Sequence, residues 1–231
     1  MIKTAKIRNI EVYSFSSRDI FLRFIENKQK ILIAINAEKI LKNDEKLEKI
    51  INSNIGYPDG IGAVMALKQK GLDAIKIPGA EFWLDFVEKF YRQKSFYLVG
   101  GTTDVIEKTV HKLKQDYQGI KITGYRNGFL NDLEKGMLIR DLQNKKPDVV
   151  FVAQGSPRQE YLMDELIKKH PALYMGLGGS FDVFCGLKKR APIFFLNLNL
   201  EWLYRLIKEP TRISRQVVLL KYYLLLKLNK L

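Results

Sequence analysis

Few titratable side chains of this sequence lie beside a predicted site, and one of them is a carboxylate on a rigid turn. Asp59 stands in Tyr-Pro-Asp-Gly, where proline presets the backbone angle φ and glycine accepts a positive φ. Turn formation alone explains this tetrapeptide. A carboxylate held on such a turn can also serve as a general base that removes a proton from an acceptor hydroxyl. We therefore take Asp59 as the candidate catalytic residue.

A second candidate region is the segment Gly155–Glu160 (GSPRQE), which follows an apolar run. Ser156 as N-cap, Pro157 at the first helical position and Gln159 completing a capping box would explain it as a helix start. The same helix N-terminus would expose unpaired amides beside Arg158, which is how sheet proteins hold a phosphate. Both interpretations fit the residues.

Two glycine pairs mark further turns. Gly178 and Gly179, with Asp182 shortly after them, would bring the backbone close to a nucleotide while the carboxylate accepts from ribose hydroxyls. A simple turn explains the same residues equally well. The pair Gly100-Gly101 lacks the spacing of both the dinucleotide-binding motif and the P-loop. The sequence therefore supports neither a dinucleotide dehydrogenase nor a P-loop NTPase.

Short β-branched or aromatic runs alternate with segments of helical periodicity. This predicts an α/β, Rossmann-like fold, a mostly parallel sheet with helices on both faces. Ligands bind beyond the carboxyl ends of such strands, and Asn36 and the glycine turns lie at the carboxyl ends of predicted strands. The predicted strands are 6–13, 30–36, 95–99, 120–123, 148–153 and 172–177. The predicted helices are 18–27, 38–52, 61–70, 80–91, 103–117, 131–143, 157–170, 200–207 and 211–227.

The bulk composition is that of one globular domain with an appendage. The chain has 231 residues, and we place the α/β domain at 1–192 and the appendage at 193–231. Cys185 is the single cysteine, which excludes an internal disulfide and a cysteine-built zinc site. The two histidines are assigned no chemistry, and we expect neither metal nor cofactor. The first residues lack the apolar run of an export signal, so we expect a cytoplasmic location.

The C-terminal segment is basic and rich in leucine. From Cys185 onward it contains ten lysines and arginines and two glutamates, a net charge of +8 in a chain of +14. Residues 217–231 as a helix would reach about 22 Å, less than the roughly 30 Å of a bilayer core. Leucines in the acyl boundary and lysines near anionic lipids would instead suit an interfacial helix. An oligomer contact or a lid on the core would explain the same residues.

Six segments, taken in order, carry a resemblance that spans nearly the whole chain. They are Ile33–Lys39 (IAINAEK), Pro58–Gly60 (PDG), Gly155–Glu160 (GSPRQE), Gly178–Val183 (GGSFDV), Lys189–Pro192 (KRAP), and Glu201–Arg205 (EWLYR) with Glu209-Pro210 and Arg212. Together they closely resemble the bacterial WecG/TagA/CpsF glycosyltransferase family.

This resemblance implies an inverting, metal-independent transfer of a sugar from a UDP-sugar to undecaprenyl-diphosphate-linked N-acetylglucosamine, at the cytoplasmic face of the membrane. The INAEK segment and the tail are most similar to the type that adds N-acetylmannosaminuronic acid, ahead of the type that adds N-acetylmannosamine. A glucose-type UDP-hexose donor is the alternative. The product would enter a bacterial surface polysaccharide.

The family's site residues carry over position by position. Asp59 matches the family's proposed base. The matched pocket residues are Asn36 and Gln159, and the matched diphosphate-binding residues are Arg205, Arg212 and Arg215. Two positions depart from the family's pattern: Ala34 stands where some relatives have threonine, and Lys76 stands where many have arginine. Lys76 exchanges a guanidinium fork for a point charge, and we keep it, with Asp182, among the candidate substrate-binding residues.

Two function classes compete with this interpretation. An isoelectric point of about 9.7 suits nucleic-acid binding. No nucleic-acid motif occurs, however, and the aromatic residues of the tail lie among leucines at helical spacing, so we expect no nucleic-acid partner. A peripheral scaffold without activity is the second competitor. The expected partners are a UDP-sugar, a polyprenyl-diphosphate-linked sugar and an anionic membrane surface, and the apolar tail also permits a homo-oligomer.

Overall fold

A six-stranded parallel sheet organises the protein. The computed structural model describes residues 2–188, 192, 194–195, 198, 201–208 and 213–231. The strand order is β4-β3-β8-β7-β5-β6, and every pairing is parallel. The strands are β3 (Ile31–Ile35), β4 (Ile55–Pro58), β5 (Ser95–Gly100), β6 (Lys121–Arg126), β7 (Val149–Ala153) and β8 (Leu173–Gly176). The predicted α/β class is confirmed.

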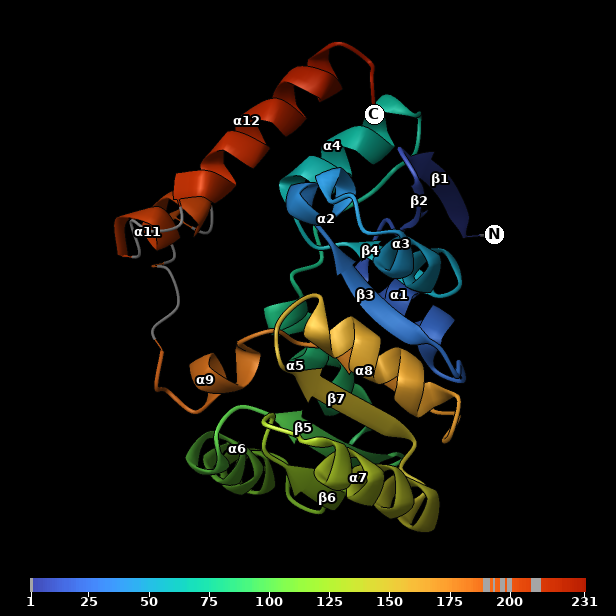
Figure 1. Cartoon of the computed structure of the whole chain (residues 1–231), viewed down its shortest axis with the longest axis vertical. Helices are drawn as coiled ribbons and strands as arrows, with labels where there is room; N and C mark the ends of the chain where they lie inside the picture. The colour runs from blue at the N-terminus through green and yellow to red at the C-terminus, as the bar shows by residue number, and fades with distance from the viewer. Residues whose placement is uncertain (1, 189–191, 193, 196–197, 199–200, 209–212) are drawn as a thin grey trace.

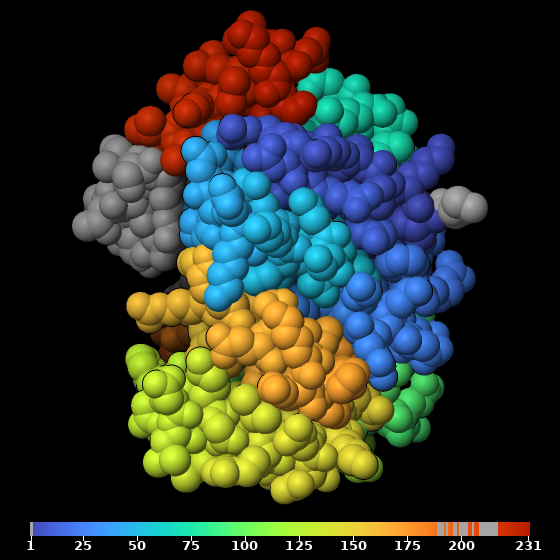
Figure 2. Space-filling view, turned by 45° about the vertical axis from the view of Figure 1, so that its right-hand side comes forward, coloured from blue at the N-terminus to red at the C-terminus, as the bar shows by residue number. Residues whose placement is uncertain are grey.

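Helices cover both faces of this sheet (Figure 1). One face carries α2 (Ala37–Leu41), α3 (Glu45–Asn52), α4 (Ile61–Gln69), α7 (Asp132–Lys145), α8 (Arg158–Ile167) and α12 (Ile213–Lys227). The other carries α1 (Arg18–Ile25), α5 (Gly79–Phe90), α6 (Thr103–Asp116) and α9 (Ser180–Phe184). A further helix, α11 (Glu201–Lys208), precedes α12. Figure 2 shows the first face, with α8 in orange between α3 in light blue and α7 in yellow-green.

The core lies on both sides of the sheet because side chains alternate along each strand. In β3, Ile31, Ile33 and Ile35 pack under the α2, α3 and α8 face, whereas Leu32 packs under the α1 and α5 face. Each of these side chains is fully buried or nearly so. Burial of an aliphatic side chain stabilises a fold by about 1.5–3 kcal/mol. The two clusters together fix the strands whose ends carry the candidate residues.

Side-chain caps set where several helices begin. Ser17, Asn36, Asp44 and Thr102 each accept a hydrogen bond from a backbone amide of the helix that follows. The cap at Asp44 divides the predicted single helix 38–52 into α2 and α3. The prediction of one continuous helix there was therefore wrong, because an N-cap inside the segment starts a second helix.

An antiparallel hairpin, β1 (Lys3–Ile7) and β2 (Ile10–Ser14), replaces the single strand predicted for 6–13. Ile7 and Ile10 are its last paired residues, so the turn consists of two residues. Arg8 adopts a φ of +52° in this turn, a conformation that favours glycine or asparagine. This turn was not predicted, because an arginine occupies the position with positive φ.

Strand β4 was not predicted at all, yet it places the candidate base. It has four residues, including Gly56 and Pro58, which are unfavourable in strands. β4 is at the edge of the sheet, where proline is tolerated. A Cβ at Gly56 would lie 2.9 Å from the Glu11 carbonyl oxygen, so glycine permits the close approach of the hairpin. Asp59 directly follows the carboxyl end of this strand.

Helix α12 packs one face on the domain and exposes the other. Tyr222 and Leu226 are buried, and the Tyr222 hydroxyl donates to the Gly62 carbonyl oxygen at 3.0 Å. The opposite face exposes Val217, Leu220, Leu224 and Leu228. Within the described part of the chain, no helix combines the length and apolar character needed to cross a bilayer.

Candidate active site

The turns that follow β3 and β4 lie against each other at the carboxyl edge of the sheet. The backbone amides of Asp59 and Gly60 both donate to the Ile35 carbonyl oxygen, at 3.0 and 3.4 Å. A Cβ at Gly60 would lie 3.4 Å from the Cβ of Asn36. The structure thus brings together two predicted site residues, Asn36 and Asp59, both half-buried.

The carboxylate of Asp59 is held by the start of a helix. Its Oδ1 accepts a hydrogen bond of 2.6 Å from the backbone amide of Gly79, the first residue of α5. Amides at a helix N-terminus lack partners within the helix, and the helix dipole favours negative charge there. A half-buried carboxylate oriented in this way is suited to remove a proton from a hydroxyl group.

Asn36 has a structural task as well as its position at the edge. It is the N-cap of α2, and its Oδ1 accepts from the Lys39 amide at 3.0 Å. The cap fixes the direction in which the chain leaves β3. A substitution at Asn36 therefore changes both the helix start and the surface next to Asp59.

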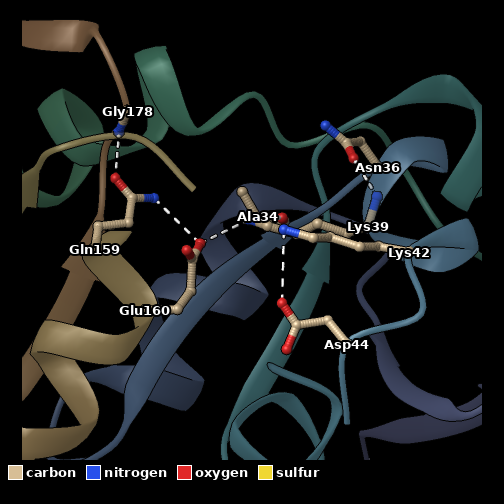
Figure 3. Close-up of polar contacts among 8 residues, drawn as sticks. All are labelled: Ala34, Asn36, Lys39, Lys42, Asp44, Gln159, Glu160 and Gly178. Carbon is tan, nitrogen blue, oxygen red and sulfur yellow. Dashed lines mark hydrogen bonds and ion pairs between the residues drawn. The ribbon is translucent and has the colours of Figure 1, made fainter. Parts of the chain in front are cut away.

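A buried polar network joins three turns of this edge (Figure 3). The ammonium Nζ of Lys39 lies 2.8 Å from Glu160 Oε1 and donates at 2.8 Å to the Ala34 carbonyl oxygen. Gln159 donates from Nε2 to Glu160 Oε1 at 3.2 Å, and its Oε1 accepts from the Gly178 amide at 2.9 Å. Lys39, Gln159 and Glu160 are 8%, 3% and 1% exposed. The network fixes the turns after β3, β7 and β8 relative to one another.

The ion pair keeps Glu160 charged. Burial alone raises the pKa of this carboxyl, but the Lys39 cation and hydrogen bonds from Lys39 and Gln159 outweigh it, so the pKa lies below its ordinary value. A buried carboxylate with such partners remains ionised at neutral pH. Removing Lys39 would leave an uncompensated charge inside the protein.

Gly176, the last residue of β8, makes room for this network. A Cβ there would lie 2.5 Å from the Nε2 of Gln159 and 3.0 Å from the methyl carbon of Met163. Any other residue would push the Gln159 amide away from Gly178. Close packing against Gln159 and Met163 therefore explains the glycine at position 176.

The predicted capping box at the start of α8 does not form. The helix begins at Arg158, with Pro157 as its N-cap and no side-chain cap hydrogen bond. Ser156 therefore is not the N-cap, and Gln159 makes its hydrogen bonds with Gly178 and Glu160 instead. The capping prediction was wrong because these partners lie in other turns of the fold. The phosphate-binding interpretation of this helix start stays a prediction, and Arg158 is exposed.

Two further predicted residues lie near this edge. The Ile77 amide donates to the Pro58 carbonyl oxygen at 2.8 Å, which places half-buried Lys76 next to the turn that carries Asp59. Asp182 lies in α9, half-buried, with its Oδ1 3.7 Å from the Nζ of Lys188. Their roles as substrate-binding residues stay predictions.

The three predicted diphosphate-binding arginines occupy the C-terminal segment. Arg205 belongs to α11 and Arg215 to α12, but their side chains lie outside the described part of the structure. Arg212 is outside the described residues altogether. In the parts of the chain that are described, no three His, Cys, Asp or Glu side chains gather as metal ligands.

Cavities lie at different ends of the sheet. One of about 330 Å³ lies between the start of α5 and α9, lined by Arg18, Glu81, Ser180 and neighbours. The other, about 680 Å³, is lined by Lys28, Asp148 and other residues that precede the strands. The larger one is at the amino edge and is therefore remote from the candidate residues.

Four residues that organise this site were not predicted from the sequence. Lys39 and Glu160 form the buried ion pair, and Tyr57 and Gly79 adjoin Asp59. A signal existed for Lys39, because a lysine in the first turn after a fully apolar strand needs a partner or water. Its partner could not be read from the sequence.

A comparison with known families covers both the sheet and the C-terminal helices. A sequence model of the glycosyl transferase WecG/TagA/CpsF family matches residues 5–231. The match includes every element that carries or directly precedes a candidate residue, namely β3, β4, α8, α9, α11 and α12. The chain therefore belongs to the WecG/TagA/CpsF family and is a glycosyltransferase.

Proposed function

We propose that this glycosyltransferase transfers a sugar from a UDP-sugar to undecaprenyl-diphosphate-linked N-acetylglucosamine. The favoured sugars are N-acetylmannosaminuronic acid and N-acetylmannosamine, with a glucose-type donor as the alternative. The family supports the transfer reaction. The position of Asp59 carries the proposal: a half-buried carboxylate at the carboxyl edge, held at 2.6 Å by the α5 N-terminus.

Asp59 acts as the general base in this proposal. As the acceptor hydroxyl oxygen bonds to the anomeric carbon, the Asp59 carboxylate takes the hydroxyl proton. The bond between the anomeric carbon and the UDP oxygen breaks on the opposite face of the sugar, so the configuration inverts. The hydrogen bond from the Gly79 amide orients the carboxylate for this step.

The departing UDP carries negative charge that the protein must stabilise. We assign this task to Arg205, Arg212 and Arg215, with Lys76 beside the Asp59 turn. Arginine presents paired donors that match phosphate oxygens, and such charge-assisted hydrogen bonds are strong. Stabilisation of the leaving group in this way requires no metal ion.

Helix α12 is proposed to rest on the cytoplasmic face of the membrane, where the lipid-linked acceptor resides. Val217, Leu220 and Leu228 are each more than 60% exposed, and Lys221 and Lys227 are exposed on the same helix. Exposed leucines next to lysines suit the boundary between acyl chains and anionic headgroups. This contact would bring the acceptor diphosphate to the C-terminal arginines.

The test is UDP release by the purified full-length protein, given a short-chain polyprenyl-diphosphate-N-acetylglucosamine and a panel of UDP-sugars in the presence of EDTA. We expect turnover with one donor, which names the sugar. Turnover that requires added Mg²⁺ would contradict the metal-independent mechanism. Absence of both turnover and UDP binding would overturn the proposal.

The membrane contact is tested separately by co-sedimentation with vesicles. We expect binding to vesicles that contain an anionic phospholipid and weak binding to purely zwitterionic vesicles. Leu220→Glu places a charge on the exposed face of α12 and should release the protein. Leu133→Glu, at a residue of α7 that is 66% exposed, is the matched control and should not. Equal release by both variants would argue against a specific role of α12.

A further inference from the structure

The hydroxyl group of Tyr57 is buried next to the candidate base without a hydrogen-bond partner among the described residues. The side chain is 0% exposed, and its ring packs against Phe21 and Phe82, with centroids 5.1 and 6.1 Å away. Burial, and then the charges of Asp59 and Glu160, raise the pKa of Tyr57 well above its usual range. A neutral hydroxyl held in a packed aromatic cluster has a fixed position.

Gly79 faces this hydroxyl. A Cβ built at residue 79 would lie 2.8 Å from the Tyr57 hydroxyl oxygen, 3.5 Å from Asp59 Oδ1 and 3.8 Å from the Ala34 Cβ. The backbone of Gly79 does not have a positive φ, so conformation does not require glycine there. The requirement is space, because neither Tyr57 nor the strand beneath it can move aside without disturbing the core.

We propose that Tyr57 and Gly79 are positioning residues for the transfer reaction. The first turn of α5 packs against the Tyr57 hydroxyl, which sets the distance of closest approach. Glycine at position 79 lets that turn come close enough for the Gly79 amide to donate to Asp59. This inference rests on the proposed role of Asp59 as the base. In this proposal the buried hydroxyl acts by its size, because a phenylalanine would leave space under the first turn of α5. This steric role explains why a buried hydroxyl without a hydrogen-bond partner in the described part of the chain is present there.

The decisive variant is Gly79→Ala. The added methyl group should displace the start of α5 and lengthen the bond from the amide to Asp59. We expect kcat to fall about 10- to 100-fold while KM for the UDP-sugar stays constant, because the donor does not bind through this contact. The acid limb of the kcat–pH profile should move to higher pH, since the carboxylate loses a donor that stabilises its charged form.

A double variant separates this mechanism from general damage. In Tyr57→Phe/Gly79→Ala the missing hydroxyl makes room for the methyl group, so kcat and the pH profile should return most of the way to the wild-type values. Tyr57→Phe alone is the second single variant of this double-mutant cycle. Gly136→Ala is the matched glycine control, because it lies within α7 and a Cβ there has nothing within 4 Å. It should leave kcat unchanged.

Two results would overturn the inference: a Gly79→Ala variant with wild-type kcat and pH profile, or a double variant as impaired as the single one. If Asp59→Asn keeps full activity, the proposed base fails independently of this contact. If the wild-type enzyme turns over no donor, thermal unfolding is compared for the wild type, Gly79→Ala, Tyr57→Phe and the double variant. Non-additive midpoints, with the double variant restored, then support the contact between Tyr57 and Gly79, and additive midpoints contradict it.

Discussion

The turns after β5 and β7 are neighbours at one edge of the sheet but serve different purposes. After β5, Thr102 accepts from the Val105 amide at 3.3 Å and caps α6. Gly100 and Gly101 have positive φ, and a Cβ at either would collide with Ala153 or Val105. The fold therefore accounts for every residue of this turn.

After β7, the polar side chains do not cap their own helix. Gln159 and Glu160 are almost fully buried, and they form hydrogen bonds and an ion pair with Gly178 and Lys39 from other turns. The contrast shows that a strand–glycine–helix sequence alone does not mark a site. Buried polar side chains that join several turns are the stronger indication, since burial without such partners would be costly.

The largest effect that tests this contrast is expected from a pair of Asp→Asn variants. Asp59→Asn keeps the shape of the side chain but removes the base, so kcat should fall about 10²- to 10⁴-fold. Asp104→Asn changes a mostly exposed carboxylate at the start of α6, paired with Lys108 at 2.9 Å, and should leave kcat unchanged. UDP release with the preferred donor measures both. A comparable loss in the two variants would show that the β5 turn also belongs to the site.

The second test breaks the buried ion pair of the β7 turn and, for comparison, the exposed ion pair of the β5 turn. Lys39→Met leaves Glu160 charged and buried, and we expect a loss of about 3–5 kcal/mol in the free energy of unfolding. Lys39→Met/Glu160→Gln removes the charge as well and should recover part of this loss. Lys108→Met breaks an exposed pair, and its denaturation midpoint should match that of the wild type. Urea unfolding of all three variants measures the difference; equal midpoints for both single variants would contradict a structural role of the buried pair.

The pH dependence of stability tests the same buried ion pair between Lys39 and Glu160. The pKa of Glu160 is lowered in the folded protein, so its ionised form contributes stability above the unfolded-state pKa, and this contribution is lost as pH falls through the folded value. In Lys39→Met, burial should instead raise the pKa, so the variant should regain stability relative to the wild type as the solution becomes acidic. Urea unfolding between about pH 4 and pH 7 measures this. A constant difference across that range would contradict the assignment.

The fold could be predicted from the sequence wherever local signals agree with the final structure. The predicted strand 148–153 and the predicted helices 103–117 and 131–143 match β7, α6 and α7 within a few residues. The prediction failed where contacts with residues far along the chain determine the secondary structure of a segment. β4 is a strand despite Gly56 and Pro58 because β3 pairs with it and the hairpin packs on it.

For the candidate site, single residues could be named from the sequence, but the contacts between them could not. Asn36 was located from its place after a strand, and it lies at the same edge as Asp59. The interpretation of Gln159 as a capping residue was wrong, because its partner Gly178 lies in another turn. The pocket role that the family resemblance implies for Gln159 stays a prediction. Lys39 and Glu160 look like ordinary charged helix residues, and only the fold shows that they are buried against each other.

The smallest expected effect concerns the cap at Thr102. Thr102→Ala removes the hydroxyl that accepts from the Val105 amide, and the free energy of unfolding should fall by about 1 kcal/mol. Because this turn only starts a helix, kcat and KM for the donor should remain those of the wild type under conditions where the variant is folded. Parallel urea unfolding and UDP-release assays separate the two quantities. A fall in kcat in the folded variant would mean that α6 helps to position substrate, and the buried network on the β7 side would then be only one half of the site.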